Sequence, residues 1–405
     1  MKNRWIAILL GLCCLCASLT ACTDEEILPQ EQPDQVGQEG TDEYGFLERV
    51  ENDIPIDATR YDENDYAVTI MGKDQFINVH GMVLFKDQDN YFPGNGLCYV
   101  NKASKVASIF CVDALCDYEL GWCTARFFGG MSMMTYSPTD GKLYGSRADA
   151  VTYGSNDGNL YSMTVDTMET KKVFTGNGNE LRFFQVQGDY VYVTRNRKEG
   201  GFEHIRYNVK TEKAEILTPP EGKIFSNLWV GNRHMIVMFM DEFELYKVNE
   251  AFDTYEKLDS NVTGVSILHG DYIYGSDTLD DDTVNYFSYN IMTKEKHVFA
   301  NNTEGLAGFH TVSDGYLYLL DDNRTCLYRI SIEGENNQPE LVFDTTRLGE
   351  ETQIRGMKRF DGDIYFSFYV KEESAVIGKI TRFGNLVRGE NGWEFVDFKQ
   401  GNVLG

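Results

Sequence analysis

Short runs of alternating apolar and aromatic residues, each preceded by a small or polar turn, recur along the chain after residue 80. Alternation with a period of two is the pattern of a β-strand. A repeat of about forty residues that holds four short strands is typical of a β-propeller blade. The sequence therefore predicts an all-β fold, a β-propeller of seven four-stranded blades. The seven runs begin at Gly81, Gly141, Gly188, Asn232, Gly270, Gly315 and Gly362.

The segment around Gly270 predicts the order of strands within one blade. The first strand is expected at 265–267, the second at 272–274, the third at 285–289 and the fourth at 295–299. The turn before the second strand contains Gly270, and glycine readily takes the positive φ angle that such turns need. A two-sheet sandwich is the competing all-β architecture, but it does not explain seven copies at similar spacing.

The two ends of the ring also have to meet. Residues 65–71 have the composition of a strand, and we expect them to add to the last blade, beside residues 393–398. Such a strand would join the ends of the chain by hydrogen bonds and leave no exposed sheet edge at the junction.

The N-terminus has the pattern of a bacterial export signal. Lys2 and Arg4 precede an apolar run at 5–17, which is too short to stay in a bilayer as a span. Leu19-Thr20-Ala21-Cys22 resembles a lipobox, which implies cleavage before Cys22 and attachment of lipid to that cysteine. The alternative is an ordinary secretory signal in which Cys22 has no role. Lipid attachment predicts a protein held on the extracytoplasmic face of the bacterial cell membrane.

The rest of the chain divides by composition. Residues 22–45 are rich in Gln, Asp, Glu and Gly, so they cannot bury enough apolar surface to fold and are expected to form an acidic tether. Residues 46–405 are expected to form a single propeller domain. The formal net charge of −26 excludes nucleic acid as the expected partner, because nucleic-acid binding needs a basic face.

Four cysteines crowd into one stretch of the predicted first blade: Cys98, Cys111, Cys116 and Cys123. In an exported protein the default expectation is one or two disulfides, and the sequence does not choose among the three possible pairings. A zinc site and free thiols are the alternatives.

The spacing Cys111-x4-Cys116-x6-Cys123, preceded by residues 96–102, resembles a segment of propeller lipoproteins from Gram-positive anaerobes. That group resembles the domain family DUF5050, which is likened to the propellers of low-density lipoprotein receptor-related proteins. The resemblance implies a surface-anchored propeller and no particular reaction. The group has a histidine where this chain has Tyr118, which disfavours zinc.

Acidic residues gather in two predicted connections between second and third strands. The first connection holds Asp277, Asp280, Asp281 and Asp282, and the second, one blade later, holds Asp321 and Asp322. Oxygen ligands of this kind suit calcium, but the spacing is not that of an EF-hand loop, and a solvated loop is the simpler interpretation. Because equivalent connections lie on one face of a propeller, we expect an acidic face that binds a basic partner.

No pattern selects catalytic residues. The six histidines form neither HxxxH nor HExxH, and no Gly-x-Ser-x-Gly occurs. We therefore expect a non-catalytic platform that binds a protein or another ligand, with no required cofactor, and leave enzyme activity open. The alternative is a surface protein that binds or cleaves polysaccharide, which exposed Trp122, Trp229 or Trp393 would favour. A helper in envelope assembly or secretion is a third possibility.

Overall fold

The computed structural model describes residues 66–68, 76–79, 82–88, 95–111, 131–147, 159–174, 181–197, 201–231, 233–240, 244–258, 262, 264–279, 283–303, 306–348, 352–360, 363–371, 379–389 and 392–400. All of them belong to one compact part of the chain, Asp34–Gly405. The predicted boundaries at residues 21 and 45 lie outside the described residues. In the described ranges no apolar helix reaches the length needed to cross a membrane.

The described strands form six sheets, of which the eight-stranded one consists of two four-stranded units, and β1 and β30 are added at the edges of two others. The strands thus make seven four-stranded antiparallel units in chain order, each called a sheet below. We number these sheets one to seven along the chain. The first strands are β2 (Phe76–Val79), β6 (Met131–Ser137), β10 (Leu181–Gln187), β14 (Phe225–Val230), β18 (Val265–His269), β22 (Leu306–Ser313) and β26 (Gln353–Phe360). The second strands are β3 (Met82–Gln88), β7 (Lys142–Arg147), β11 (Tyr190–Asn196), β15 (Met235–Phe239), β19 (Tyr272–Thr278), β23 (Tyr316–Asp321) and β27 (Asp363–Lys371).

The outer half of each sheet has the same order. The third strands are β4 (Asn95–Asn101), β8 (Leu160–Thr164), β12 (Phe202–Asn208), β16 (Leu245–Val248), β20 (Val284–Asn290), β24 (Cys326–Ser331) and β28 (Lys379–Gly389). The fourth strands are β5 (Val106–Ile109), β9 (Thr170–Phe174), β13 (Lys213–Leu217), β17 (Tyr255–Lys257), β21 (Lys296–Thr303), β25 (Glu340–Asp344) and β29 (Gly392–Asp397). A short 3-10 helix, η1 (Thr345–Leu348), follows β25.

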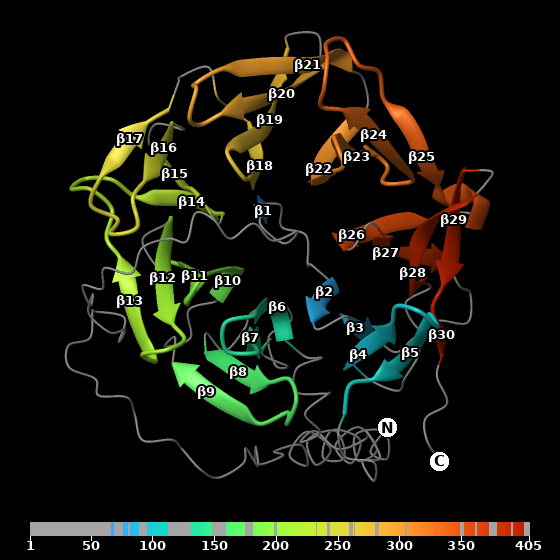
Figure 1. The fold of residues 1–405 in the computed structure, drawn as a ribbon, viewed down its shortest axis with the longest axis horizontal. Helices are drawn as coiled ribbons and strands as arrows, with labels where there is room; N and C mark the ends of the chain where they lie inside the picture. Colours follow the sequence, from blue (N-terminus) through green and yellow to red (C-terminus); the bar gives the residue numbers. More distant parts are fainter. Residues whose placement is uncertain are drawn as a thin grey trace, which may run out of the picture. The chain divides into compact units, whose positions relative to one another are not determined.

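The sheets succeed one another around a common centre, with the first strands innermost (Figure 1). Each first strand contacts the first strand of the next sheet, and β26 of sheet seven contacts β2 of sheet one, so the sequence of contacts closes on itself. Sheets three and four are also joined by one strand pair, Phe202 with Phe225. The prediction of an all-β propeller with four-stranded sheets is confirmed. The number of blades in the whole chain stays a prediction.

The seven recurring runs of the sequence are the second strands. A second strand is covered on both faces, which explains its apolar and aromatic composition. In β11, Val191 and Val193 pack toward sheet two, whereas Tyr190 and Tyr192 pack toward sheet four. This alternation follows from the pleat of the strand, which sends successive side chains to opposite faces. The turn before the second strand also agrees with the prediction, since Gly270 has φ of +57°.

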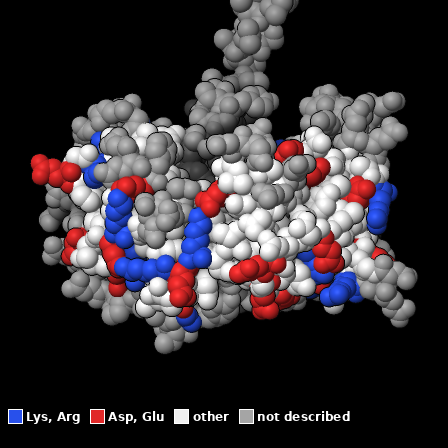
Figure 2. Space-filling view, turned by 90° about the horizontal axis from the view of Figure 1, so that it is seen from above, with Lys and Arg blue, Asp and Glu red and all other residues white. Residues whose placement is uncertain are grey.

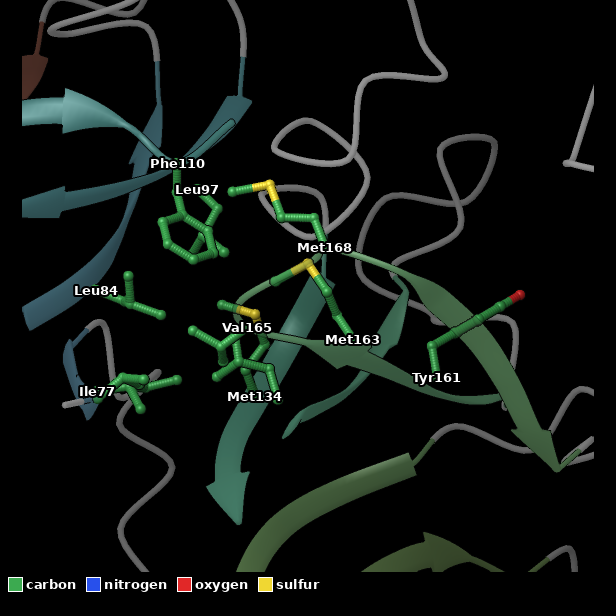
Figure 3. Close-up of a cluster of buried hydrophobic side chains, with 11 residues drawn as sticks. Ile77, Leu84, Leu97, Phe110, Met134, Tyr161, Met163, Val165 and Met168 are labelled. Carbon is green, nitrogen blue, oxygen red and sulfur yellow. The ribbon is translucent and has the colours of Figure 1, made fainter. Parts of the chain in front are cut away.

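The core consists of seven apolar clusters, one between each pair of adjacent sheets. Figure 3 shows the cluster between sheets one and two, where Leu97 and Phe110 of sheet one face Met163 and Met168 of sheet two. Methionine has a flexible side chain that fills irregular gaps between sheets. Because each sheet packs only on its neighbours, the fold extends to this length without one large central core.

The ring closes through the cluster between sheets one and seven. Phe85 of sheet one and Phe383 of sheet seven have ring centroids 4.7 Å apart, and Phe398 packs 5.6 Å from Phe85. A short strand, β30 (Lys399–Gln400), then pairs in parallel with Val106 and Ala107 at the outer edge of β5. Closure therefore combines aromatic packing with one added strand on sheet one.

The prediction that residues 65–71 add a strand to the last blade was wrong. β1 (Tyr66–Val68) pairs antiparallel with β18 of sheet five, not with sheet seven. Residues 393–398 do not lie beside it, because Gly392–Asp397 is the fourth strand of sheet seven and pairs with β28. All four strands of sheet seven come from residues 353–397, so this sheet is complete without a strand from the beginning of the chain.

Strand direction gives the propeller two different sides. The turns between first and second strands and between third and fourth strands lie on one side, the turn side. The connections between second and third strands, and from each fourth strand to the next sheet, lie on the other, the connection side. On the turn side an asparagine recurs after the third strand, and in sheets one, three and five its Oδ1 accepts two backbone N–H groups. These asparagines are Asn101, Asn208 and Asn290.

Candidate functional site

The two acidic connections lie at equivalent places in adjacent sheets. Asp277 is near the end of β19 in sheet five, and Asp321 ends β23 in sheet six, so both precede a connection between second and third strands. Both connections therefore belong to the connection side, as the sequence predicts from their order in the repeat. Asp280, Asp281 and Asp282 lie outside the described residues.

Asp277 is held by a lysine of its own sheet. Its Oδ2 accepts a hydrogen bond from Lys296 Nζ at 2.7 Å. The Lys296 ammonium also lies 4.0 Å from the centroid of the Phe287 ring, and this cation–π contact stabilises the charged lysine there. Both carboxyl and ammonium groups remain partly exposed, so this contact orients Asp277 at the surface without burying it.

Asp321 organises the connection that follows it. Its Oδ1 accepts the backbone N–H groups of Thr325 and Cys326 at 2.6 and 2.7 Å, and its Oδ2 accepts the Thr325 hydroxyl at 2.8 Å. The carboxylate therefore fixes the turn, a role that the sequence interpretation missed. The signal for it was a threonine four residues after the aspartate. Asp322 is exposed, as are Asn323 and Arg324 of the same connection.

Two of the four clustered cysteines, Cys98 and Cys111, are described, and both lie at the seam between sheets one and seven. Cys98 in β4 is fully buried in the closing cluster, and Cys111, just after β5, packs against the same cluster. Cys22, Cys116 and Cys123 lie outside the described residues, so the choice among disulfides, zinc and thiols stays a prediction. Among the residues that the structure describes, no group of three His, Cys, Asp or Glu side chains has the arrangement of a metal site.

His234 connects two adjacent sheets through Asp271. His234 Nε2 lies 2.9 Å from Oδ1 of Asp271, so the turn of sheet four is joined to the turn of sheet five. Arg233 donates to the other oxygen of Asp271 at 2.8 Å. Burial lowers the pKa of His234, although its bond to Asp271 acts in the opposite direction. This pair lies on the turn side and links two sheets.

A polar seam lies between sheets three and four. His204 is buried, with Nδ1 2.8 Å from the Thr194 hydroxyl, and its ring centroid lies 4.8 Å from that of Phe225. Burial lowers the pKa of His204 to about 3, so the imidazole is neutral at physiological pH. Nearby in the same sheet, the buried Arg206 guanidinium forms an ion pair with the equally buried Glu215.

Arg206 also ties sheet three to sheet four. Its Nη1 donates to the backbone oxygen of Glu250 at 2.6 Å. The guanidinium lies 4.8 Å from the Tyr190 ring and 6.0 Å from the Phe252 ring, which places it between an aromatic side chain of each sheet. The sequence analysis did not single out Arg206 or Glu215. In the structure the arrangement fixes the spacing of two sheets.

The described tryptophans give little support to a sugar-binding surface. Trp229 is 1% exposed and packs in the cluster between sheets four and five, so its ring cannot stack on a sugar. Trp393 is partly buried against the cluster between sheets six and seven. Trp122 lies outside the described residues.

Acidic and basic side chains are interspersed over the described surface in Figure 2, and neither sign forms a continuous field in that view. Several of these charges join neighbouring sheets, as Lys171 does with Glu212 at 2.7 Å and Lys294 with Glu256 at 2.6 Å. Exposed pairs of this kind add little stability. The surface described so far therefore has mixed charge.

No model of a protein family matches the chain, and no curated protein matches it in sequence. Solved structures are similar to it. The β-propeller domain of the Trilobed protease from Pyrococcus furiosus, with an open velcro topology, aligns with a TM-score of 0.50 and 12% identity, over 83% of this chain and 98% of that domain.

Two acylaminoacyl peptidases are also similar in structure. One, in complex with Z-Gly-Gly-Phe-chloromethyl ketone, has a TM-score of 0.53 at 12% identity over 85% of this chain. The other, from Pyrococcus horikoshii, has a TM-score of 0.51 at 11% identity over 81% of this chain. The chain spans 55% and 52% of their lengths, respectively. At these identities the likeness concerns the fold alone, and together with the sheet arrangement it defines the chain as a β-propeller protein.

Proposed function

We propose that this protein is a lipid-anchored β-propeller on the outer face of a bacterial cell membrane, where it binds another protein without catalysing a reaction. The observation that carries the proposal is the pair of acidic connections, led by Asp277 and by Asp321 and Asp322, at equivalent ends of adjacent sheets. Rigid strands hold such connections in place while their sequence can vary, which suits recognition. The partner would present basic groups.

The sequence supports the location of this platform. The lipobox-like residues before Cys22 and the acidic segment at 22–45 have the order of an anchor and a tether. Each methylene of an attached acyl chain adds about 0.8 kcal/mol of membrane affinity. The resemblance to DUF5050-like propeller lipoproteins belongs to the same proposal. Binding or cleavage of polysaccharide remains the alternative function, to which the two described tryptophans, Trp229 and Trp393, give little support.

Replacing Cys22 with serine is expected to release the protein from the membrane, because serine cannot carry the thioether-linked lipid. In a Gram-positive host, wild-type protein should fractionate with membranes and be accessible to protease added to intact cells. The Cys22→Ser variant should appear in the medium.

The matched control is Cys16→Ser, which makes the same chemical change six residues earlier in the signal. This variant should remain with the membrane. Retention of Cys22→Ser in the membrane, or wild-type protein in the cytosol, would contradict the anchoring part of the proposal.

A further inference from the structure

The inner edge of sheet five carries a strand from a distant part of the chain. β18 pairs with β19 on one side and with β1 on the other, giving the order β1-β18-β19-β20-β21. Tyr66 lies opposite His269, Ala67 opposite Leu268 and Val68 opposite Ile267. The next strand after β1, β2, belongs to sheet one, so β1 is an insertion and not part of the four-stranded repeat.

In each four-stranded sheet the first strand pairs with the second strand along one edge only. The backbone N–H and C=O groups of its other edge therefore need hydrogen-bond partners from elsewhere. In sheet four that solution is a pair of side chains from sheet three. Gln185 donates to Leu228 O at 3.0 Å and accepts from Val230 N at 2.6 Å, while Gln187 donates to Gly231 O. The glutamine amides imitate a short stretch of strand and cover the edge of β14.

Sheet five solves the same problem differently. Where β10 directs two glutamines at β14, β14 has Trp229, whose indole packs with Leu268 in the apolar cluster between sheets four and five. An indole in an apolar cluster does not imitate a strand, whereas the backbone of Tyr66–Val68 does. β1 also contacts β14, so it lies beside the first strands of two adjacent sheets. The edge of β18 thus accepts a strand where the edge of β14 accepts side chains.

We propose that the inner edge of β18, formed by the backbone of Ile267, Leu268 and His269, is an acceptor site for an extended peptide of a partner protein, and that Tyr66–Val68 covers it until the partner binds. An extended segment added to a sheet edge gains affinity from main-chain hydrogen bonds. The described part of β1 forms three residue pairs with β18, and a peptide that forms more pairs can replace it. This inference adds to the proposed function by naming the class of partner, an extended peptide segment. It rests on the proposed function in one respect only, namely that the partner is a protein.

The test compares peptide binding to full-length protein with and without a competent β1. The probe is a fluorescent peptide with the sequence of residues 65–71, Asp-Tyr-Ala-Val-Thr-Ile-Met. Ala67→Pro removes the central N–H of β1 and disfavours its pairing. Because a tethered strand competes at high effective concentration, the variant should bind the peptide at least about tenfold more tightly than wild type. Ala67→Ser, which keeps the N–H, should bind like wild type.

A peptide control and a second variant keep the test decisive. The same peptide N-methylated at both its third and fourth positions should not bind, because one of two successive N–H groups in an antiparallel strand always faces the partner strand. If Ala67→Pro does not fold, Val68→Gly weakens the same pairing without proline, because glycine is disfavoured in strands. A folded variant that binds no more tightly than wild type, or that binds the N-methylated peptide equally well, would overturn the inference. The binding assay involves neither the lipid nor the acidic connections, so its failure would leave the anchoring result standing.

Discussion

Replacing Glu215 with leucine is expected to lower the free energy of unfolding by about 3–5 kcal/mol, because Arg206 would stay buried without its counter-charge. The Arg206 and Glu215 side chains are 1% and 4% exposed, so water cannot replace the lost partner. The contact of Arg206 with Glu250 O and its place between two aromatic rings would keep the guanidinium in the interface. Urea denaturation of wild type and variant measures the difference.

Two further variants make this prediction specific. The double variant Arg206→Met with Glu215→Leu should recover much of the loss, because apolar side chains of similar size can replace a buried ion pair. Lys210→Met breaks a pair with Asp189 in which the lysine is 64% exposed, so it should cost about 1 kcal/mol or less. A loss for Glu215→Leu as small as that for Lys210→Met would show that the buried pair contributes no more to stability than an exposed one.

Acidification from pH 7.5 to pH 5 is expected to remove about 2 kcal/mol of stability through His204 alone. Burial lowers the pKa of His204 from 6.5 to about 3, so in this range the unfolded chain binds a proton that the folded chain does not. Stability is therefore highest above pH 6.5 and falls as the pH drops toward 3. His234 and His269 add to the loss, since burial lowers their pKa values as well.

The measurement is the free energy of unfolding as a function of pH for wild type and His204→Asn. Asparagine can keep the bond to the Thr194 hydroxyl, so the comparison concerns the slope with pH and not the loss of that bond. The variant should lose about 2 kcal/mol less than wild type over this range. Equal slopes for wild type and His204→Asn would contradict the prediction.

The strands could be predicted because neighbouring sheets cover both faces of each second strand, which requires a run of apolar and aromatic residues that is visible in the sequence. Each second strand contains a short apolar and aromatic run, and a glycine with positive φ often stands before it, as Gly270 does. The order of four strands per sheet followed from the repeat. The position of the acidic connections followed as well, since the place of a connection in the repeat determines the side of the propeller on which it lies.

The contacts between sheets were not predictable in the same way. Arg206 and Glu215 stand nine residues apart in the sequence, and only the register of β12 with β13 places them opposite each other. Nothing in their local pattern distinguishes them from exposed charges. The place of β1 was also missed, because 65–71 has the composition of a strand but composition does not say which sheet edge is open. The structural role of Asp321 was missed, and the residue was predicted only to belong to a solvated acidic connection that could bind a partner or a cation, because the sequence shows its charge and not the N–H groups whose hydrogen bonds it accepts.

The measurement that tests the proposed platform most directly is affinity purification of the full-length, Cys22-anchored protein from gently solubilised native membranes, followed by mass spectrometry. It should be made in parallel on a variant with Asp280, Asp281, Asp282 and Asp322 changed to asparagine. A control variant changes an equal number of exposed turn-side carboxylates to glutamine, at Glu169, Glu295, Glu333 and Glu335. The account predicts a near-stoichiometric protein partner with wild type and the control, and loss of that partner with the connection variant. No partner with wild type, or equal recovery with the connection variant, would contradict it.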